Sequence, residues 1–136
     1  MSYSIKSILL VDDDQDDKYF FAKALDKLET SEDVQLSTAC DGADALEKLK
    51  FCNPDVILLD LNMPVMNGVA FLKKIKSEKS LKDIPVIIYT DGVSVFDEAE
   101  ALKLGAYTII LKPIDFKGAV DIISGILQMS FIRMSA

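Results

Sequence analysis

Four short apolar runs of this sequence are each ended by residues that can do polar chemistry. In chain order these residues are the carboxylates Asp12 and Asp13, the carboxylate Asp60, the hydroxyl of Thr90 and the ammonium group of Lys112. Carboxylates that crowd together repel one another, and a hard divalent cation such as Mg²⁺ offsets that repulsion. The backbone carbonyl of Asn62 could supply the cation with another oxygen. Carboxylate, metal, lysine and hydroxyl are together the groups that hold a phosphoryl group, whose charge must be neutralised from several sides.

Asp60 follows the run that organises the rest of the chain. Val56–Leu59 contains no polar residue and is preceded by Asn53-Pro54, a pattern typical of a strand buried on both faces. In an open parallel sheet, ligands bind in the crevice beyond the carboxyl ends of the strands. We therefore expect Asp60 at that edge, held by a rigid strand. Because Asp is also common in turns, its position alone leaves a purely structural role open.

The elements that position these residues alternate between strand and helix along the chain. Apolar runs predict strands, and apolar residues at helical spacing predict a helix after each one. The expected strands are 5–11, 34–39, 56–59, 85–90 and 106–111, and the expected helices are 15–29, 43–50, 68–77, 95–104 and 115–128. Such alternation predicts an α/β fold: a flavodoxin-like, doubly wound, five-stranded parallel sheet in the order 2-1-3-4-5 with five helices. In that order the first and third strands lie side by side, which brings Asp12 and Asp60 together.

Length and composition limit the possible functions. The 136 residues suffice for one domain with a sizeable core, and the formal net charge of −7 argues against binding nucleic acid or an anionic membrane surface. The chain has no histidine, which excludes imidazole catalysis and histidine metal sites. Its two cysteines, Cys40 and Cys52, fit no metal spacing, and we expect them to be buried free thiols. No signal-peptide pattern or membrane span is evident, so a cytoplasmic location is expected.

Four motifs of the chain, in order and at suitable spacing, resemble those of the receiver domain of two-component response regulators. They are Ile8-Leu9-Leu10-Val11-Asp12-Asp13-Asp14, Leu58-Leu59-Asp60-Leu61-Asn62-Met63-Pro64, Tyr89-Thr90 and Leu111-Lys112-Pro113. The resemblance spans nearly the whole chain and is strongest to stand-alone receivers of the chemotaxis-regulator type. It implies a receiver domain over residues 1–130 and a short C-terminal tail over residues 131–136, with no output domain.

The resemblance also implies a role for each residue of the motifs. Asp60 would be the phosphoacceptor, a carboxylate nucleophile that becomes an aspartyl phosphate. Mg²⁺ would be held by Asp13 directly, by Asp12 directly or through water, by Asp60 and by the backbone carbonyl of Asn62. Thr90 and Lys112 would each contact a phosphoryl oxygen. Pro113 is expected to follow a cis peptide bond that helps to aim Lys112.

The function that follows is a single-domain response regulator that is not a turnover enzyme and catalyses only its own phosphorylation and dephosphorylation. It would accept phosphate from a sensor histidine kinase or phosphotransfer protein and change its affinity for an unknown downstream protein. One alternative is a Mg²⁺-dependent aspartyl-phosphate phosphatase, which generally needs an Asp where this chain has Asn62. A phosphorylation-independent scaffold is another. A flavodoxin is disfavoured because the acidic loop after the first strand would repel a flavin phosphate.

Several further expectations concern residues around these motifs. Asp14, Asp16 and Asp17 are assigned to helix capping and solubility, because acids are favoured at helix N-termini. Ile109 stands where the family often has a switch aromatic, and Tyr107 lies two residues earlier. Asp91 follows Thr90 where a small residue is usual, and we hypothesise that it alters the lifetime of the aspartyl phosphate. Apolar residues of 95–104, 106–111 and 115–128 either form a partner or homodimer surface or simply fill the core.

Overall fold

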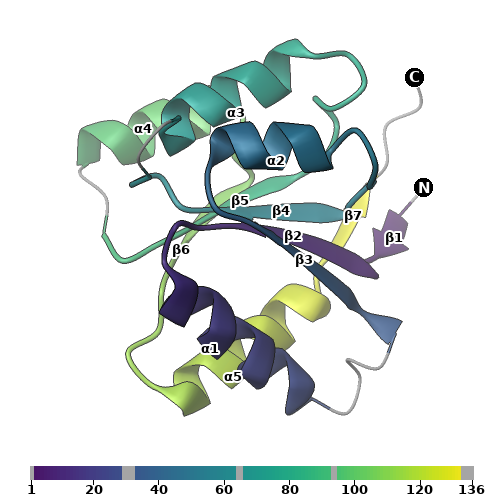
Figure 1. The fold of residues 1–136 in the computed structure, drawn as a ribbon, viewed down its shortest axis with the longest axis vertical. Helices are drawn as coiled ribbons and strands as arrows, with labels where there is room; N and C mark the ends of the chain where they lie inside the picture. Colours follow the sequence, from purple (N-terminus) through teal and green to yellow (C-terminus); the bar gives the residue numbers. More distant parts are fainter. Residues whose placement is uncertain (1, 29–32, 64–65, 93–94, 133–136) are drawn as a thin grey trace.

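The computed structural model describes residues 2–28, 33–63, 66–92 and 95–132. Its centre is a five-stranded parallel sheet in the order β3-β2-β4-β5-β6 (Figure 1). The strands are β2 (Ser7–Val11), β3 (Gln35–Ala39), β4 (Val56–Leu59), β5 (Val86–Thr90) and β6 (Thr108–Leu111). They are the first to fifth predicted strands, so the predicted order 2-1-3-4-5 is confirmed.

Helices cover both faces of the sheet, as a doubly wound fold requires. α1 (Gln15–Asp26) and α5 (Phe116–Leu127) pack against each other on one face. The other face carries α2 (Gly42–Lys48), α3 (Gly68–Ser77) and α4 (Val95–Lys103) (Figure 1). The predicted bounds of the sheet strands and helices agree with these to within three residues. The flavodoxin-like arrangement, with five helices in the described part of the chain, is therefore confirmed.

The core lies in two clusters, one on each face of the sheet, because successive strand residues point to opposite faces. Leu9 of β2 and Ile57 of β4 belong to the cluster under α3, whereas Leu10 and Leu58 belong to the cluster that contains Phe21 of α1. Every residue of β4 is fully buried. Burial of about 1.5–3 kcal/mol per large apolar side chain makes this strand the most constrained support available for Asp60.

Helix ends follow the capping residues in the sequence. Asp41 accepts a hydrogen bond from the backbone N–H of Asp44 at 2.7 Å and so caps the start of α2. Asp14 likewise accepts from the N–H of Asp17 at 3.0 Å at the start of α1. Gly105, after α4, has a φ of 109°, a left-handed conformation that glycine adopts at little cost.

Two short strands lie outside the predicted set. β1 (Ser2–Ser4) pairs antiparallel with β7 (Ser130–Ile132), so the two ends of the described chain meet beside the main sheet (Figure 1). The tail predicted for 131–136 thus begins within a strand, and residues 133–136 lie outside the described residues. Three-residue strands carry too short a pattern to be recognised, and their pairing joins opposite ends of the sequence.

The expectation for the cysteines was partly wrong. Both thiols are free, but Cys40 is exposed and Cys52 only partly buried. Each stands just beyond a secondary-structure element, Cys40 after β3 and Cys52 after α2, where the chain turns toward solvent. Within the described residues, no helix is both long and apolar enough to cross a membrane.

Gly68 allows α3 to start directly against the end of β4. A Cβ atom on Gly68 would lie 2.5 Å from the Cα of Leu61 and 2.6 Å from the backbone oxygen of Asp60. Both atoms belong to the backbone, so neither can move aside cheaply. The N–H of Gly68 also donates to the carbonyl of Leu61 at 3.1 Å. The close packing at Gly68 therefore sets the path of the chain after Asp60.

We predict that Gly68→Ala lowers the free energy of unfolding by about 1–3 kcal/mol, the usual cost of overpacking. Urea denaturation followed by circular dichroism measures the change. Gly125→Ala is the matched control, because nothing lies within 4 Å of a Cβ there and alanine is the better helix former. Equal stability of Gly68→Ala and wild type would show that the contact at Asp60 does not constrain the chain.

Candidate functional site

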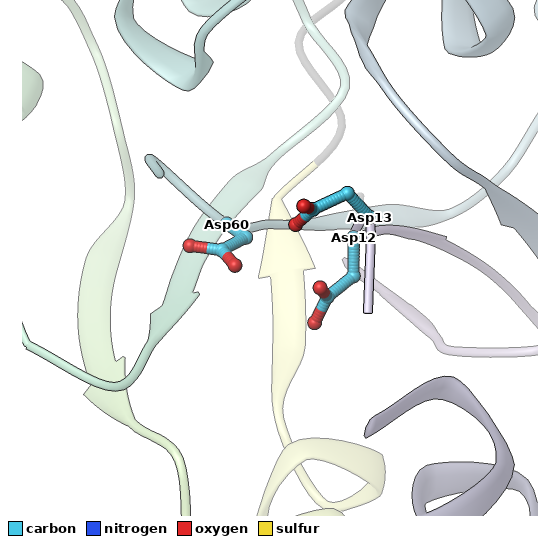
Figure 2. Close-up of side chains that lie close together, drawn as sticks. All are labelled: Asp12, Asp13 and Asp60. Atoms are coloured by element: carbon cyan, nitrogen blue, oxygen red, sulfur yellow. The ribbon is translucent and has the colours of Figure 1, made fainter. Parts of the chain in front are cut away.

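The carboxyl ends of β2 and β4 bring three carboxylates together. Val11 and Leu59 are register partners in these strands, so Asp12 and Asp60 follow them side by side. The backbone N–H of Asp60 donates to the carbonyl of Val11 at 3.0 Å. Carboxylate oxygens of Asp12, Asp13 and Asp60 all lie within 4.8 Å of one another, and Figure 2 shows the three side chains around a common space. The predicted acidic site is therefore present in the fold.

Lys112 supplies the positive charge that this cluster needs. Its Nζ lies 2.6 Å from Asp12 Oδ2, 2.8 Å from Asp17 Oδ2 and 3.2 Å from Asp60 Oδ2. Only 5% of the Lys112 side chain is exposed. Burial acts to lower the pKa of Lys112, but its close contacts with the carboxylates of Asp12 and Asp17 and the charges of Asp12 and Asp60 outweigh it and hold that pKa well above its usual value. The ammonium group therefore stays charged.

Asp12 carries the least satisfied atom of the site. Its Oδ1 accepts a hydrogen bond from the N–H of Asp14 at 2.9 Å. Its Oδ2 is buried and has no hydrogen-bond partner, although it forms the ion pair with Lys112. Burial raises the pKa of Asp12 more than Lys112 lowers it. A buried carboxylate oxygen with unused lone pairs, beside two other carboxylates, fits the oxygen ligands that Mg²⁺ prefers.

Asp60 is held by different groups on its two oxygens. Oδ1 accepts from the hydroxyl of Thr90 and from the backbone N–H of Asn62, both at 3.0 Å. Oδ2 faces Lys112. Thr90 is fully buried at the end of β5, and the Asn62 side chain donates to the carbonyl of Gly92 at 3.2 Å. The five predicted residues Asp12, Asp13, Asp60, Thr90 and Lys112 thus meet at one edge of the sheet.

Other expectations around the site had mixed outcomes. The structure has no cis peptide bond among the described residues, so the cis bond expected before Pro113 was wrong. The cis and trans forms of such a bond differ by only about 0.5–1 kcal/mol, which leaves the isomer to tertiary context. Ile109 packs against the core, whereas Tyr107 is 56% exposed. Asp91 is exposed at the edge of the site.

Some of the residues proposed for a partner surface fill the core, and others are exposed. Six apolar residues of α5 are buried or packed against a core cluster, namely Ala119, Val120, Ile122, Ile123, Ile126 and Leu127, whereas Phe116 is 38% exposed. The role of these six residues is therefore core filling. Leu111 remains exposed, and the side chain of Phe96 lies outside the described residues. A homodimer through this face stays a prediction.

Asp17 is the site residue that sequence reasoning missed. It was assigned to helix capping, yet its carboxylate contacts Lys112 at 2.8 Å. Asp17 lies in the first turn of α1, directly after the acidic loop that ends β2. That position borders the same edge of the sheet, which was the available signal. The contact itself joins residues far apart in sequence, so no local pattern could reveal it.

Comparison with known proteins agrees with this geometry. The sequence matches the family described as response regulator receiver domain over residues 8–124. The chain belongs to this family. Receiver domains are signalling modules of two-component systems that accept a phosphoryl group and bind Mg²⁺ at an acidic pocket. The acidic cluster of this receiver is the corresponding feature of the described chain.

The family match extends to relatives and to solved structures. The receiver is 44% identical over 93 residues to the protein-glutamate methylesterase/protein-glutamine glutaminase of Clostridium acetobutylicum, covering 65% of the chain and 26% of that protein. The chain spans about a quarter to a half of the length of the curated relatives it matches.

Two solved structures match the fold along nearly their whole length. The phosphorylated cyanobacterial phytochrome response regulator RcpA has a TM-score of 0.81 at 30% identity, with 90% of this chain and 91% of that one covered. The Mn²⁺-bound response regulator Rcp1 has a TM-score of 0.80 at 29% identity, with 96% and 99% covered. The resemblance to small, stand-alone receivers is therefore confirmed.

We predict that Asp12→Asn raises the free energy of unfolding by roughly 1 kcal/mol near neutral pH without divalent cations, because burial of this carboxylate costs more than its pairing with Lys112 returns, and Lys112 keeps Asp17 and Asp60 as partners. The raised pKa of Asp12 means that its ionised form opposes folding, so the gain shrinks as the pH falls and the wild-type carboxyl becomes protonated. Urea denaturation at neutral and mildly acidic pH measures this, with the exposed Asp13→Asn as control. A less stable Asp12→Asn protein at neutral pH contradicts the prediction.

Proposed function

We propose that this receiver accepts a phosphoryl group on Asp60 in a Mg²⁺-dependent reaction and thereby switches its binding to a partner. The observation that carries the proposal is the environment of the Asp60 carboxylate. One oxygen is held by Thr90 and Asn62, and the other faces Lys112 and the acidic cluster. The Asp60 carboxylate is thus oriented by a rigid strand. It lies beside Lys112 and the proposed Mg²⁺ site, whose positive charges would offset the charge of a phosphoryl group.

The proposed transfer is a nucleophilic substitution at phosphorus. An Asp60 carboxylate oxygen forms a P–O bond while the bond from phosphorus to the donor breaks, and the donor leaves with that electron pair. The donor is a phosphohistidine of a sensor kinase or phosphotransfer protein, or a small acyl phosphate. Water later attacks the aspartyl phosphate and releases inorganic phosphate, which restores the Asp60 carboxylate. The chain therefore acts on itself and turns over no separate substrate.

Mg²⁺ would be held by the carboxylates of Asp12, Asp13 and Asp60 and by the backbone carbonyl of Asn62. The buried, unsatisfied Oδ2 of Asp12 supports this assignment. When bound, the ion supplies positive charge to the transferring phosphoryl oxygens. Rcp1, which was solved in a Mn²⁺-bound form, supports the binding of a divalent cation by a receiver of this fold.

Thr90 and Lys112 are the proposed sensors of phosphorylation. The Thr90 hydroxyl now donates to Asp60, and Lys112 contacts the other oxygen of the same carboxylate. A phosphoryl group on Asp60 offers each of them a more highly charged acceptor, so both would exchange their present contacts for it. Movement at Thr90 would pass to the surface near β5 and β6, where a cytoplasmic downstream protein or a second receiver would bind. Tyr107, exposed beside β6, is a candidate readout of that movement.

Incubation with acetyl phosphate and Mg²⁺, followed by intact-mass measurement, tests the function. Wild type is expected to gain the mass of one phosphoryl group, and Asp60→Asn is expected to gain none. Asp16→Asn is the matched control, because Asp16 is an exposed acid of the same region. Continuous phosphate release from many substrates would instead support a phosphatase, and absence of any adduct on the wild-type protein would support a scaffold.

We predict that Asp91→Asn lengthens the lifetime of the aspartyl phosphate. A carboxylate next to Thr90 repels the phosphoryl group and can order the attacking water, so its removal slows hydrolysis. An interaction of about 1 kcal/mol, the size expected between two charges fully exposed to water, corresponds to a roughly fivefold change in the rate of hydrolysis. The decay of the phosphorylated mass after removal of acetyl phosphate measures the lifetime. Unchanged decay ends the hypothesis.

A further inference from the structure

Lys112 contacts three carboxylates, and these have different roles in the proposed reaction. Asp12 and Asp60 belong to the acidic cluster and are almost fully buried, with 1% and 8% of their side chains exposed. Asp17 lies outside that cluster, and 35% of its side chain is exposed. Asp17 is thus the one of these three partners that neither the metal nor the phosphoryl group engages.

Lys112 neutralises carboxylate charge that a bound divalent cation would also neutralise. Its ammonium group neutralises one oxygen on each of two carboxylates of the cluster, Asp12 Oδ2 and Asp60 Oδ2. A cation held by these carboxylates competes with Lys112 for their negative charge, and two cations this close repel each other. Binding of the ion therefore becomes easier if Lys112 has another partner that it can keep.

We propose that Asp17 is a positioning residue that retains Lys112 when a divalent cation takes its place at Asp12 and Asp60, and so favours binding of that cation. This inference rests on the proposed function and specifies how its metal site is regulated. Lys112 Nζ lies 2.8 Å from Asp17 Oδ2, between its distances of 2.6 Å to Asp12 Oδ2 and 3.2 Å to Asp60 Oδ2, so Asp17 is already a full partner of the ammonium group. The contact with Asp17 joins the start of α1 to the end of β6, so it also fixes the position of the ammonium group.

A simpler role for Asp17 must be distinguished from this one. Asp17 stands in the first turn of α1, where any carboxylate gains about 0.3–1 kcal/mol from the helix dipole. It also adds negative charge near the cluster, which would attract a cation without any help from Lys112. The helix role predicts an effect on stability alone, and the charge role predicts an effect on metal binding that does not depend on Lys112.

A double-mutant cycle on Mg²⁺ binding separates these roles, because coupling appears only if the two residues act through each other. Isothermal titration calorimetry with Mg²⁺ alone, without any phosphodonor, is performed on wild type, Asp17→Asn, Lys112→Met and the double variant. Asp16→Asn is the matched control, because it removes a first-turn acid that is not a partner of Lys112. Lys112→Gln replaces Lys112→Met if the latter does not fold.

Asp17→Asn is expected to weaken Mg²⁺ binding by roughly three- to tenfold, within the range of coupling seen in one ion-pair network. Asp16→Asn is expected to change it by less than about twofold, and the effect of Asp17→Asn is expected to disappear without Lys112. Equal weakening with and without Lys112, or no weakening at all, overturns the inference while leaving the proposed function standing. A wild-type protein that gains a phosphoryl group but binds no Mg²⁺ overturns the inference together with the metal requirement.

Discussion

The crowding of carboxylates around one buried ammonium group is the constraint on which this structure depends. Asp12 and Asp60 are almost completely buried, in a region where an unpaired carboxylate charge would be costly. Lys112 makes that arrangement tolerable, but one ammonium group cannot neutralise all of the carboxylates around it. The site is therefore left with excess negative charge. This charge attracts a cation but does not stabilise the fold.

The fold keeps these charges together because its strands leave them no room to separate. β2 and β4 are neighbours in the sheet and nearly all of their residues are buried, so their carboxyl ends cannot move apart without exposing core side chains. Gly68 lets α3 begin directly against the chain that carries Asp60. Electrostatic repulsion is thus opposed by hydrophobic packing, which is the larger energy in a sheet buried on both faces.

The proposed acceptance of a phosphoryl group by Asp60, at the carboxyl edge of the sheet, would link the chemistry of the site to signalling. Thr90 and Lys112 contact the Asp60 carboxylate from β5 and from the end of β6, two strands on the same side of β4. In the proposed function, a change in the charge on Asp60 would therefore be sensed first on that side of the molecule. Asp17 adds a contact to Lys112 from α1, so the lysine would connect the proposed metal ligands with the proposed phosphoryl sensors.

The sequence by itself determined the fold and most of the site. Buried strands such as β4 have continuous apolar runs, and residues directly after such strands, such as Asp12, Asp60 and Lys112, must gather where parallel strands end. Only the tertiary structure decided the pairing of β1 with β7, the trans bond before Pro113 and the contact of Asp17 with Lys112. Periodicity and capping act between near neighbours in sequence, whereas these three features depend on contacts between distant segments, or on small energy differences that such contacts settle.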